Sequence, residues 1–247
     1  MATKETVYIS IGSNLADRKQ NLQKAVFLID KKLGAVSSLS PIYNTPAWGF
    51  DGADFLNACV KLETTATPEA CLEALMQIEK ALGRQRTQAN GYISRLIDLD
   101  IIYYGTHVIR NERLTVPHPR MEARRFVLKP LADIAPQFYH PIQQKDSRNL
   151  LQECRDQTKL SKTTGKLYAS RTALFTSLEF ITIEGNIGAG KTSLATKISE
   201  DFNAKLILER FAENPFLPSF YEDQSRYAFP LEMSFLADRY QPVSYTH

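Results

Sequence analysis

Two aspartates, Asp98 and Asp100, stand two residues apart in the apolar stretch LIDLDIIYYG, residues 96–105. Residues at this spacing on a strand point to the same side, so the two carboxylates are expected to lie close together. Hard oxygen ligands of this kind suit Mg²⁺ that bridges the phosphates of a nucleotide. The alternative is a pair of solvated strand residues, and the D-x-D spacing alone leaves both readings open.

Basic residues flank this pair on both sides. Arg84, Arg86 and Arg95 precede it in a stretch with little apolar patterning. Such a loop can bring positive charge and a lid to a phosphoryl transfer, although three arginines in a loop are more often plain surface. His118 follows between two prolines, and a lone histidine is usually structural. Four arginines near it raise the prospect of a phosphate donor: Arg113, Arg120, Arg124 and Arg125.

The elements that must position these residues come in the order strand, helix, strand, strand, helix, strand. We expect strands over residues 6–14, 36–45, 54–64 and 96–105, and helices over 17–34 and 67–84. Thr67 is expected to cap the second helix, with Pro68 at its first position and Gly83 at its end. This order predicts an α+β, ferredoxin-like βαββαβ domain with helices on one face of an antiparallel sheet. A further short helix is expected before Pro136.

A second chemical signal lies near the C-terminus, where G-x-x-x-x-G-K-T runs from Gly185 to Thr192. It follows FITIEG, which reads as a strand, and precedes a helical stretch, so a phosphate-binding P-loop is expected. Lys191 would reach the terminal phosphates and Thr192 would bind Mg²⁺. The loop glycines expected at the phosphates are Gly185, Gly188 and Gly190.

Composition limits the other classes of function. The net charge of +3 is too small to indicate nucleic-acid binding, and no apolar run is long enough to span a membrane. Cys59, Cys71 and Cys154 are odd in number and lack C-x-x-C spacing, which favours a reduced, cytoplasmic setting over disulfides or zinc. Small-molecule partners are expected, and the oligomeric state stays open.

Six sequence blocks resemble the 6-hydroxymethyl-7,8-dihydropterin pyrophosphokinase family, in family order and at family spacing. They cover roughly residues 5–155 and are IGSN (11–14), YNTPAWG (43–49), DFLNACV (54–60), QIEKALGRQR (77–86), SRLIDLDIIYYG (94–105) and LTVPHPRMEARRFVLKPLADIAP (114–136). The resemblance implies transfer of diphosphate from the co-substrate ATP to the pterin alcohol, with release of AMP. It also implies two Mg²⁺ ions.

The resemblance assigns roles to residues that match the family's motifs. Asp98 and Asp100 match the two Mg²⁺-binding aspartates, and Arg84 and Arg95 match catalytic loop arginines. The positions matched to the pterin site are Thr45, Pro46, Phe55, Asn57 and Phe126. The positions matched to the ATP site are Glu79, Arg86, Arg113, Thr115, His118 and Arg124.

The sequence from about residue 179 to 241 resembles the deoxynucleoside kinase family, whose loop has the form GNIGAGKT. Glu209 matches its candidate base. A P-loop kinase needs a larger parallel sheet than about 70 residues can build, so an incomplete P-loop α/β segment without kinase activity is expected. The expected division is a pyrophosphokinase domain over 1–155, a linker over 156–178 and this segment over 179–247. The alternative for 156–178 is the ragged end of the first domain. The alternatives are a bifunctional enzyme that also phosphorylates deoxynucleosides, or a nucleotide-binding module without turnover.

Overall fold

The structure is a computed structural model that describes residues 3–47, 49, 51–84, 94–186, 188–208 and 214–244. Arg86 and Glu209, which the sequence singled out, therefore lie outside the described residues. The chain divides into two compact units, residues 1–177 and 178–247. Each unit is described by itself below.

The first unit is built on an antiparallel sheet. Strands and helices follow as β1 (Glu5–Ser13), α1 (Arg18–Lys32), β2 (Val36–Leu39), β3 (Tyr43–Thr45), β4 (Phe55–Thr64), α2 (Pro68–Ala81) and β5 (Asp98–Tyr104). The strands lie in the order β5-β1-β4-β3, and β2 also pairs with β4. The predicted α+β class and antiparallel sheet are confirmed, with the expected strand over 36–45 split into β2 and β3.

The two helices begin where the sequence predicts. The Thr67 side chain accepts a hydrogen bond from the amide of Ala70, Pro68 opens α2, and Gly83 follows its end with a φ of 90°. This φ lies in the left-handed region, which glycine adopts without a steric penalty. Both helices bury one face on the same side of the sheet, against a core that includes Ile9 and Leu62.

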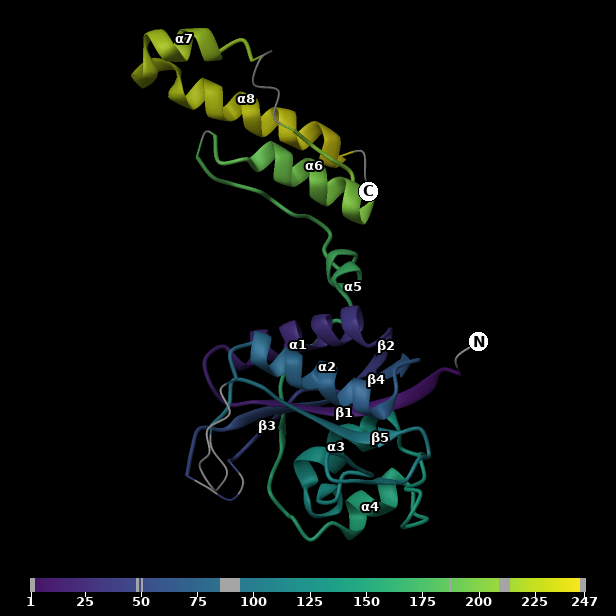
Figure 1. The fold of residues 1–247 in the computed structure, drawn as a ribbon. Helices are drawn as coiled ribbons and strands as arrows, with labels where there is room; N and C mark the ends of the chain where they lie inside the picture. Colours follow the sequence, from purple (N-terminus) through teal and green to yellow (C-terminus); the bar gives the residue numbers. More distant parts are fainter. Residues whose placement is uncertain are drawn as a thin grey trace. The chain divides into compact units, whose positions relative to one another are not determined.

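The opposite face of the sheet is also covered, which corrects the expectation of helices on one face. A turn of 3-10 helix, η1 (Met121–Ala123), leads into α3 (Arg125–Ile134), and α4 (Ser147–Glu153) follows. Figure 1 shows α3 and α4 on the side of the sheet opposite α1 and α2. Their apolar residues join Tyr8 and Tyr103 in a second core. Both faces of the central strand β1 are therefore covered, and its residues from Val7 to Ser13 are buried.

The remaining strands are short. The strands β6 (Ile109–Arg110) and β7 (Thr115–Val116) pair in a separate two-stranded sheet. The strand β8 (Ser161–Lys162) pairs with the edge strand β3.

The strand β8 corrects the expected linker over 156–178. The amide of Thr163 donates to the carbonyl of Ile42 at 2.9 Å, and Leu167 is buried in the core of the sheet. Tyr168 exchanges two hydrogen bonds with the side chain of Gln23 on α1, each 2.9 Å long. Residues 161–168 thus belong to the first unit, and a short α5 (Arg171–Phe175) follows. The strand was not predicted from the sequence because only two residues of this segment pair in the sheet.

The second unit is helical in its described part. It contains α6 (Lys191–Phe202), α7 (Leu217–Glu222) and α8 (Gln224–Ser244). The strand expected at FITIEG does not form, since residues 180–186 have no regular secondary structure and Phe180 is 65% exposed. A strand needs a partner for its N–H and C=O groups, and no strand occurs among the described residues of this unit.

In neither unit is any helix of the described residues both long and apolar enough to cross a membrane.

Candidate active site

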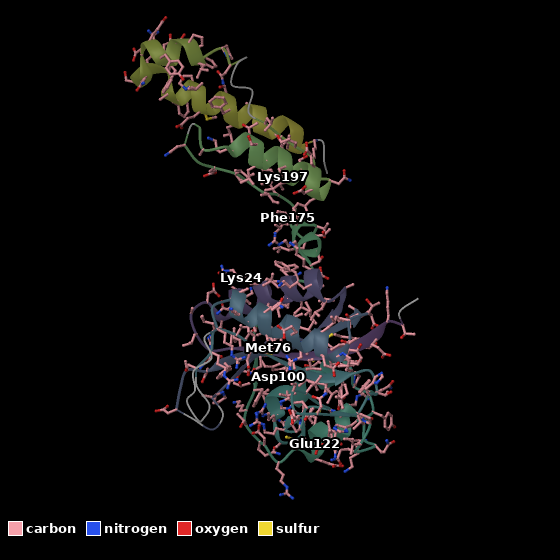
Figure 2. All side chains as sticks on the ribbon, viewed as in Figure 1. Lys24, Met76, Asp100, Glu122, Phe175 and Lys197 are labelled. Carbon is pink, nitrogen blue, oxygen red and sulfur yellow. The ribbon has the colours of Figure 1, made fainter. Side chains whose placement is uncertain are left out.

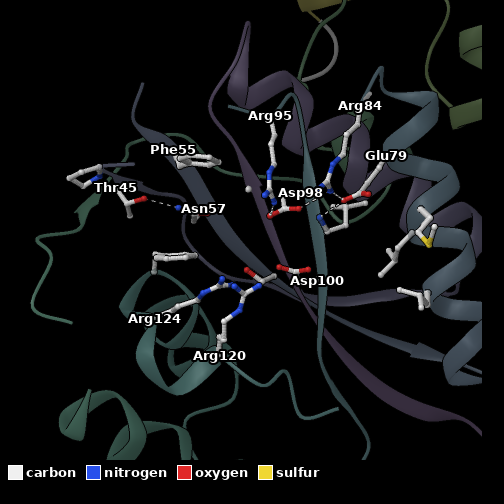
Figure 3. A pocket seen from close by; sticks show the side chains of 18 residues that line it. Thr45, Phe55, Asn57, Glu79, Arg84, Arg95, Asp98, Asp100, Arg120 and Arg124 are labelled. Atoms are coloured by element: carbon white, nitrogen blue, oxygen red, sulfur yellow. Dashed lines mark hydrogen bonds and ion pairs between the residues drawn. The ribbon is translucent and has the colours of Figure 1, made fainter. Parts of the chain in front are cut away.

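A cavity of about 210 Å³ opens at one end of the sheet of the first unit. Its walls come from the sheet strands, from α2 and from the segment that ends in α3 (Figure 3). Segments far apart in the sequence therefore meet here. Most of the site residues predicted for this unit from the sequence line this cavity.

The aspartate pair occupies the floor of the cavity. Asp98 and Asp100 both line it, while Leu99 between them is turned into the core and is 6% exposed. Pairing of β5 with the central strand β1 fixes this orientation, since Asp98 lies opposite Gly12 and Asp100 opposite Ser10. The expectation that both carboxylates share one side of a strand thus agrees with the geometry.

Two arginines hold the first aspartate. Arg84 donates to Oδ1 of Asp98 at 2.7 Å, and Arg95 donates to Oδ2 at 2.6 Å. Both contacts are drawn in Figure 3. The side chains of all three residues are between 18% and 25% exposed, so water screens these pairs only in part. The two loop arginines therefore already stand beside the carboxylates.

Glu79 fixes this arrangement from behind. Its carboxylate, on α2, is 5% exposed, bonds the guanidinium of Arg84, and accepts the amide of Leu99 at 2.9 Å. It thereby holds both a loop arginine and the backbone between the two aspartates. The resemblance placed Glu79 near ATP, and it does line the cavity.

Asn14, at the end of β1, anchors the second arginine and was not among the predicted site residues. Its Oδ1 accepts the amide of Arg95 at 2.6 Å, and its Nδ2 donates to Oγ of Ser94 at 3.0 Å and to the carbonyl of Ala53 at 3.2 Å. Asn14 is 3% exposed. In the sequence it stands at the end of the predicted first strand, and no local pattern marks its contact with Arg95.

The second wall is aromatic and amide-bearing. Phe55, Pro46 and Phe126 line the cavity, together with a Thr45–Asn57 pair in which Nδ2 of Asn57 donates to Oγ1 of Thr45 at 2.7 Å. Gly12 was also missed by the sequence prediction. A Cβ on Gly12 would lie 2.7 Å from Oδ1 of Asn57, so no larger residue fits without moving this amide.

His118 stands behind the floor of the cavity and is not among its lining residues. Its Nδ1 accepts the amide of Arg120 at 3.2 Å, and its Nε2 lies 4.0 Å from Oδ2 of Asp100. The pKa of His118 is lowered to about 4, and burial is the largest cause. The positive charges of Arg124 and Arg120 also lower this pKa, and the negative charge of Asp98 opposes them. An imidazole with this pKa is neutral at pH 7.

Asp100 shows the electrostatic strain of the pair. Burial, and next the negative charge of Asp98, raise the pKa of Asp100 to about 6, against the opposing charge of Arg124. Two carboxylates this close resist full ionisation unless a cation is shared. The described residues offer no group of three or more metal-binding side chains. Mg²⁺ is commonly held by one or two carboxylates together with substrate phosphates, and Asp98 and Asp100 could supply such carboxylates.

Other predicted residues lie elsewhere. Arg113 is exposed and pairs with Glu73 at 3.3 Å, and Thr115 lies in β7 opposite Arg110. Neither lines the cavity. Arg124 does line it and is 5% exposed, with its guanidinium 5.7 Å from the centre of the Phe126 ring.

The glycine loop of the second unit has a conformation of its own. Gly188 and Gly190 have φ angles of 79° and 82°, in the left-handed region. Nζ of Lys191 donates to the carbonyl oxygens of Gly185 and Asn186, at 2.7 Å and 2.9 Å. The lysine thus bonds its own loop, and Thr192 follows it in the first turn of α6.

Comparisons with known proteins match both parts of the chain. A family model described as "7,8-dihydro-6-hydroxymethylpterin-pyrophosphokinase (HPPK)" matches residues 8–136, and one described as "Deoxynucleoside kinase" matches residues 181–246. The 2-amino-4-hydroxy-6-hydroxymethyldihydropteridine pyrophosphokinase of Bacillus subtilis is 44% identical over 132 residues, which cover 53% of this chain and 78% of that protein. Both resemblances stated from the sequence are confirmed.

A second relative is much longer than the matched region. The "Folic acid synthesis protein fol1" of Pneumocystis carinii is 42% identical over 139 residues, which cover 56% of this chain but 18% of that protein. The chain therefore spans less than a fifth of that relative's length. A crystal structure of wild-type Plasmodium falciparum HPPK-DHPS aligns with a TM-score of 0.52 at 15% identity, over 61% of this chain and 44% of that one. At this identity the likeness supports the fold alone.

Proposed function

The chain belongs to the 7,8-dihydro-6-hydroxymethylpterin-pyrophosphokinase family through residues 8–136, and from this premise we propose that its cavity transfers diphosphate from ATP to 6-hydroxymethyl-7,8-dihydropterin. The observation that carries the proposal is the aspartate pair on β5 with Arg84 and Arg95 bound to Asp98. Phosphoryl transfer depends on positioned positive charge and metal ions around the phosphates, which this arrangement could supply.

The aromatic wall is the proposed pterin site. Phe55 and Phe126 offer ring faces for offset stacking, and the Thr45–Asn57 pair offers a donor and acceptors for the edge of the heterocycle. The apolar side chains of Leu72 and Met76 on α2 line the cavity as well and suit the purine of ATP. The aspartates lie between these regions, where the triphosphate must meet the pterin alcohol.

The reaction then balances as a single displacement. The hydroxymethyl oxygen of the pterin forms a bond to the β-phosphorus of ATP, the bond from that phosphorus to the α-bridging oxygen breaks, and AMP leaves. The alcohol proton passes to water that reaches the partly exposed carboxylates of Asp98 and Asp100. The fixed charged groups around them meet the charge that develops in the transition state. Asp98 and Asp100 would hold Mg²⁺, which supplies neutralisation of the triphosphate charge; we propose two ions.

The protein's own part is positioning and charge. Arg84 and Arg95 stand within reach of the transferred group and can move from Asp98 to phosphate oxygens, and Glu79 keeps Arg84 directed at the cavity. Arg86, Arg113, Thr115 and His118 stay proposals from the resemblance. The buried thiols Cys59, Cys71 and Cys154 are free, which supports a reducing, cytoplasmic setting.

The second unit is proposed to lack deoxynucleoside kinase activity as it stands. Its FITIEG segment forms no strand, and Lys191 bonds the carbonyls of its own loop instead of presenting Nζ outward. ADP formed from ATP only when a deoxynucleoside is added would contradict this and favour the bifunctional alternative.

The test of the main proposal is product analysis with a matched variant. The full chain is incubated with ATP, Mg²⁺ and 6-hydroxymethyl-7,8-dihydropterin, and AMP is followed by chromatography. Pterin-dependent AMP release is expected from the wild type and not from Asp98→Ala, whose fold is checked by circular dichroism. A folded Asp98→Ala variant that still releases AMP would remove the metal assignment, and binding of both substrates without turnover would favour a non-catalytic module.

A further inference from the structure

We propose that Arg120 binds the diphosphate group, both on ATP and on the pterin product, from the side of the aspartate pair opposite Arg84 and Arg95. The proposal rests on the proposed function and adds a binding residue to it. Arg120 was noted in the sequence only as part of the basic surroundings of His118, and no role follows for it from the matched motifs.

The backbone directs Arg120 into the cavity. It is the residue before η1, and Arg124 is the residue after it, so the two arginines stand at either end of one short turn. Met121 inside the turn is fully buried in the second core, which pins the turn to the sheet. Both arginines line the cavity, and Figure 3 shows their guanidinium groups near Asp100.

The turn is held by backbone bonds, from Met121 N–H to the His118 carbonyl and from Arg124 N–H to the Met121 carbonyl, each 3.1 Å long. Arg120 makes no side-chain capping bond to it. A smaller residue at position 120 could therefore keep the same backbone, which separates a binding role from a structural one.

The charged groups of the cavity and the exposure of Arg120 indicate which ligand this arginine binds. Among the described residues, four arginines and three carboxylates line the cavity. Arg124 is almost fully buried, whereas Arg120 is exposed and lines the cavity from its rim. A guanidinium at an open rim suits a mobile, highly charged group, and its fork matches phosphate oxygens. The neutral pterin alcohol offers it no such partner.

The inference predicts a split between two ligands that differ only in the diphosphate. Equilibrium dialysis of the full chain with Mg²⁺ is used to measure Kd for 6-hydroxymethyl-7,8-dihydropterin and for its diphosphate. The variant Arg120→Ala is expected to weaken the diphosphate about 10-fold, the low end for a lost charged hydrogen bond because the site is open to water. Its affinity for the alcohol should stay unchanged, and Arg120→Lys should recover part of the loss.

Arg148→Ala is the matched control. Arg148 lies exposed on α4, away from the cavity lining, so this variant removes the same charge from the molecule without touching the site. It should leave both Kd values as in the wild type. Turnover should show the same split, with Arg120→Ala raising the KM for ATP and leaving the KM for the pterin unchanged.

Each outcome of these measurements supports or contradicts a role for Arg120 in diphosphate binding. If the wild type releases AMP but Arg120→Ala binds the diphosphate as tightly as Arg148→Ala does, Arg120 has no such role. Equal weakening of alcohol and diphosphate, with a lowered melting temperature, would indicate a structural role and also overturn the inference. A wild type that releases no AMP and does not prefer the diphosphate would instead refute the proposed function on which the inference rests.

Discussion

Replacing Glu79 with glutamine tests how the floor of the cavity is held. The buried carboxylate of Glu79 bonds both the amide of Leu99 and the guanidinium of Arg84. Hydrogen bonds to a charged group contribute about 1.5–3 kcal/mol, and neutral ones about 0.5–1.5 kcal/mol. Glu79→Gln keeps the shape, makes the bond from the Leu99 amide neutral and leaves the bond from Arg84 charged on the arginine only, so the free energy of unfolding should fall by about 2 kcal/mol.

Glu79→Ala should cost more, because it also leaves the buried Leu99 amide without its partner. The expected loss is about 3–5 kcal/mol, the range for breaking a buried ion pair. The control is Glu73→Gln on the same helix, whose side chain is 53% exposed, pairs with the exposed Arg113 and accepts a 3.5 Å hydrogen bond from Nε2 of Gln77. Its effect should stay within about 0.5 kcal/mol. Urea unfolding of the variants measures all three values.

Glu79→Gln should also shift the pH dependence of activity. The negative charge of Glu79 is one of the causes that raise the pKa of Asp100 to about 6. Removing it lowers that pKa, so Asp100 stays ionised to lower pH and the acidic limb of the kcat/KM profile should shift to lower pH. An acidic limb that moves upward, or a Glu79→Gln variant as stable as Glu73→Gln, would refute this reasoning.

Three further predictions concern stability. Asn14→Ala removes the bonds that hold the loop at Arg95 and should cost about 2–3 kcal/mol, with faster hydrogen exchange at the Arg95 amide; unchanged exchange would contradict it. Leu167→Ala should cost about 2–4 kcal/mol by thermal unfolding, whereas a true linker residue would cost nothing. Burial lowers the pKa of His140, whose Nδ1 accepts two backbone amides. The unfolded chain therefore takes up this proton first, and stability falls as the pH drops below about 6.5; His140→Asn should weaken this dependence between pH 7 and 5, and an equal slope would refute it.

The features of the fold that depend on short stretches of sequence were predicted correctly. Thr67 and Pro68 start α2 as expected, because capping and a fixed proline φ act within one turn. The period of two residues along a strand predicted that Asp98 and Asp100 lie on the same side of β5. The order of elements predicted the antiparallel sheet, because strand, helix, strand, strand, helix, strand is the order of the split βαβ fold.

Features that depend on contacts between distant segments were missed. Asn14 reaches Arg95 across 81 residues, and Gly12 is small because of Asn57, 45 residues later. No local pattern marks such pairs. The strand β8 was taken for linker because two residues give no periodicity, although they cover the edge of β3. The strand expected at FITIEG had the right composition, but composition cannot supply the neighbouring strand that it needs.

The central claim is that both terminal phosphorus atoms of ATP pass to the pterin together. The most direct measurement uses ATP labelled at the β-phosphorus, incubated with the full chain, Mg²⁺ and 6-hydroxymethyl-7,8-dihydropterin. The label should appear in the pterin product, in step with unlabelled AMP. Label recovered in ADP, with at most one phosphate on the pterin, would contradict diphosphate transfer and with it the proposed function.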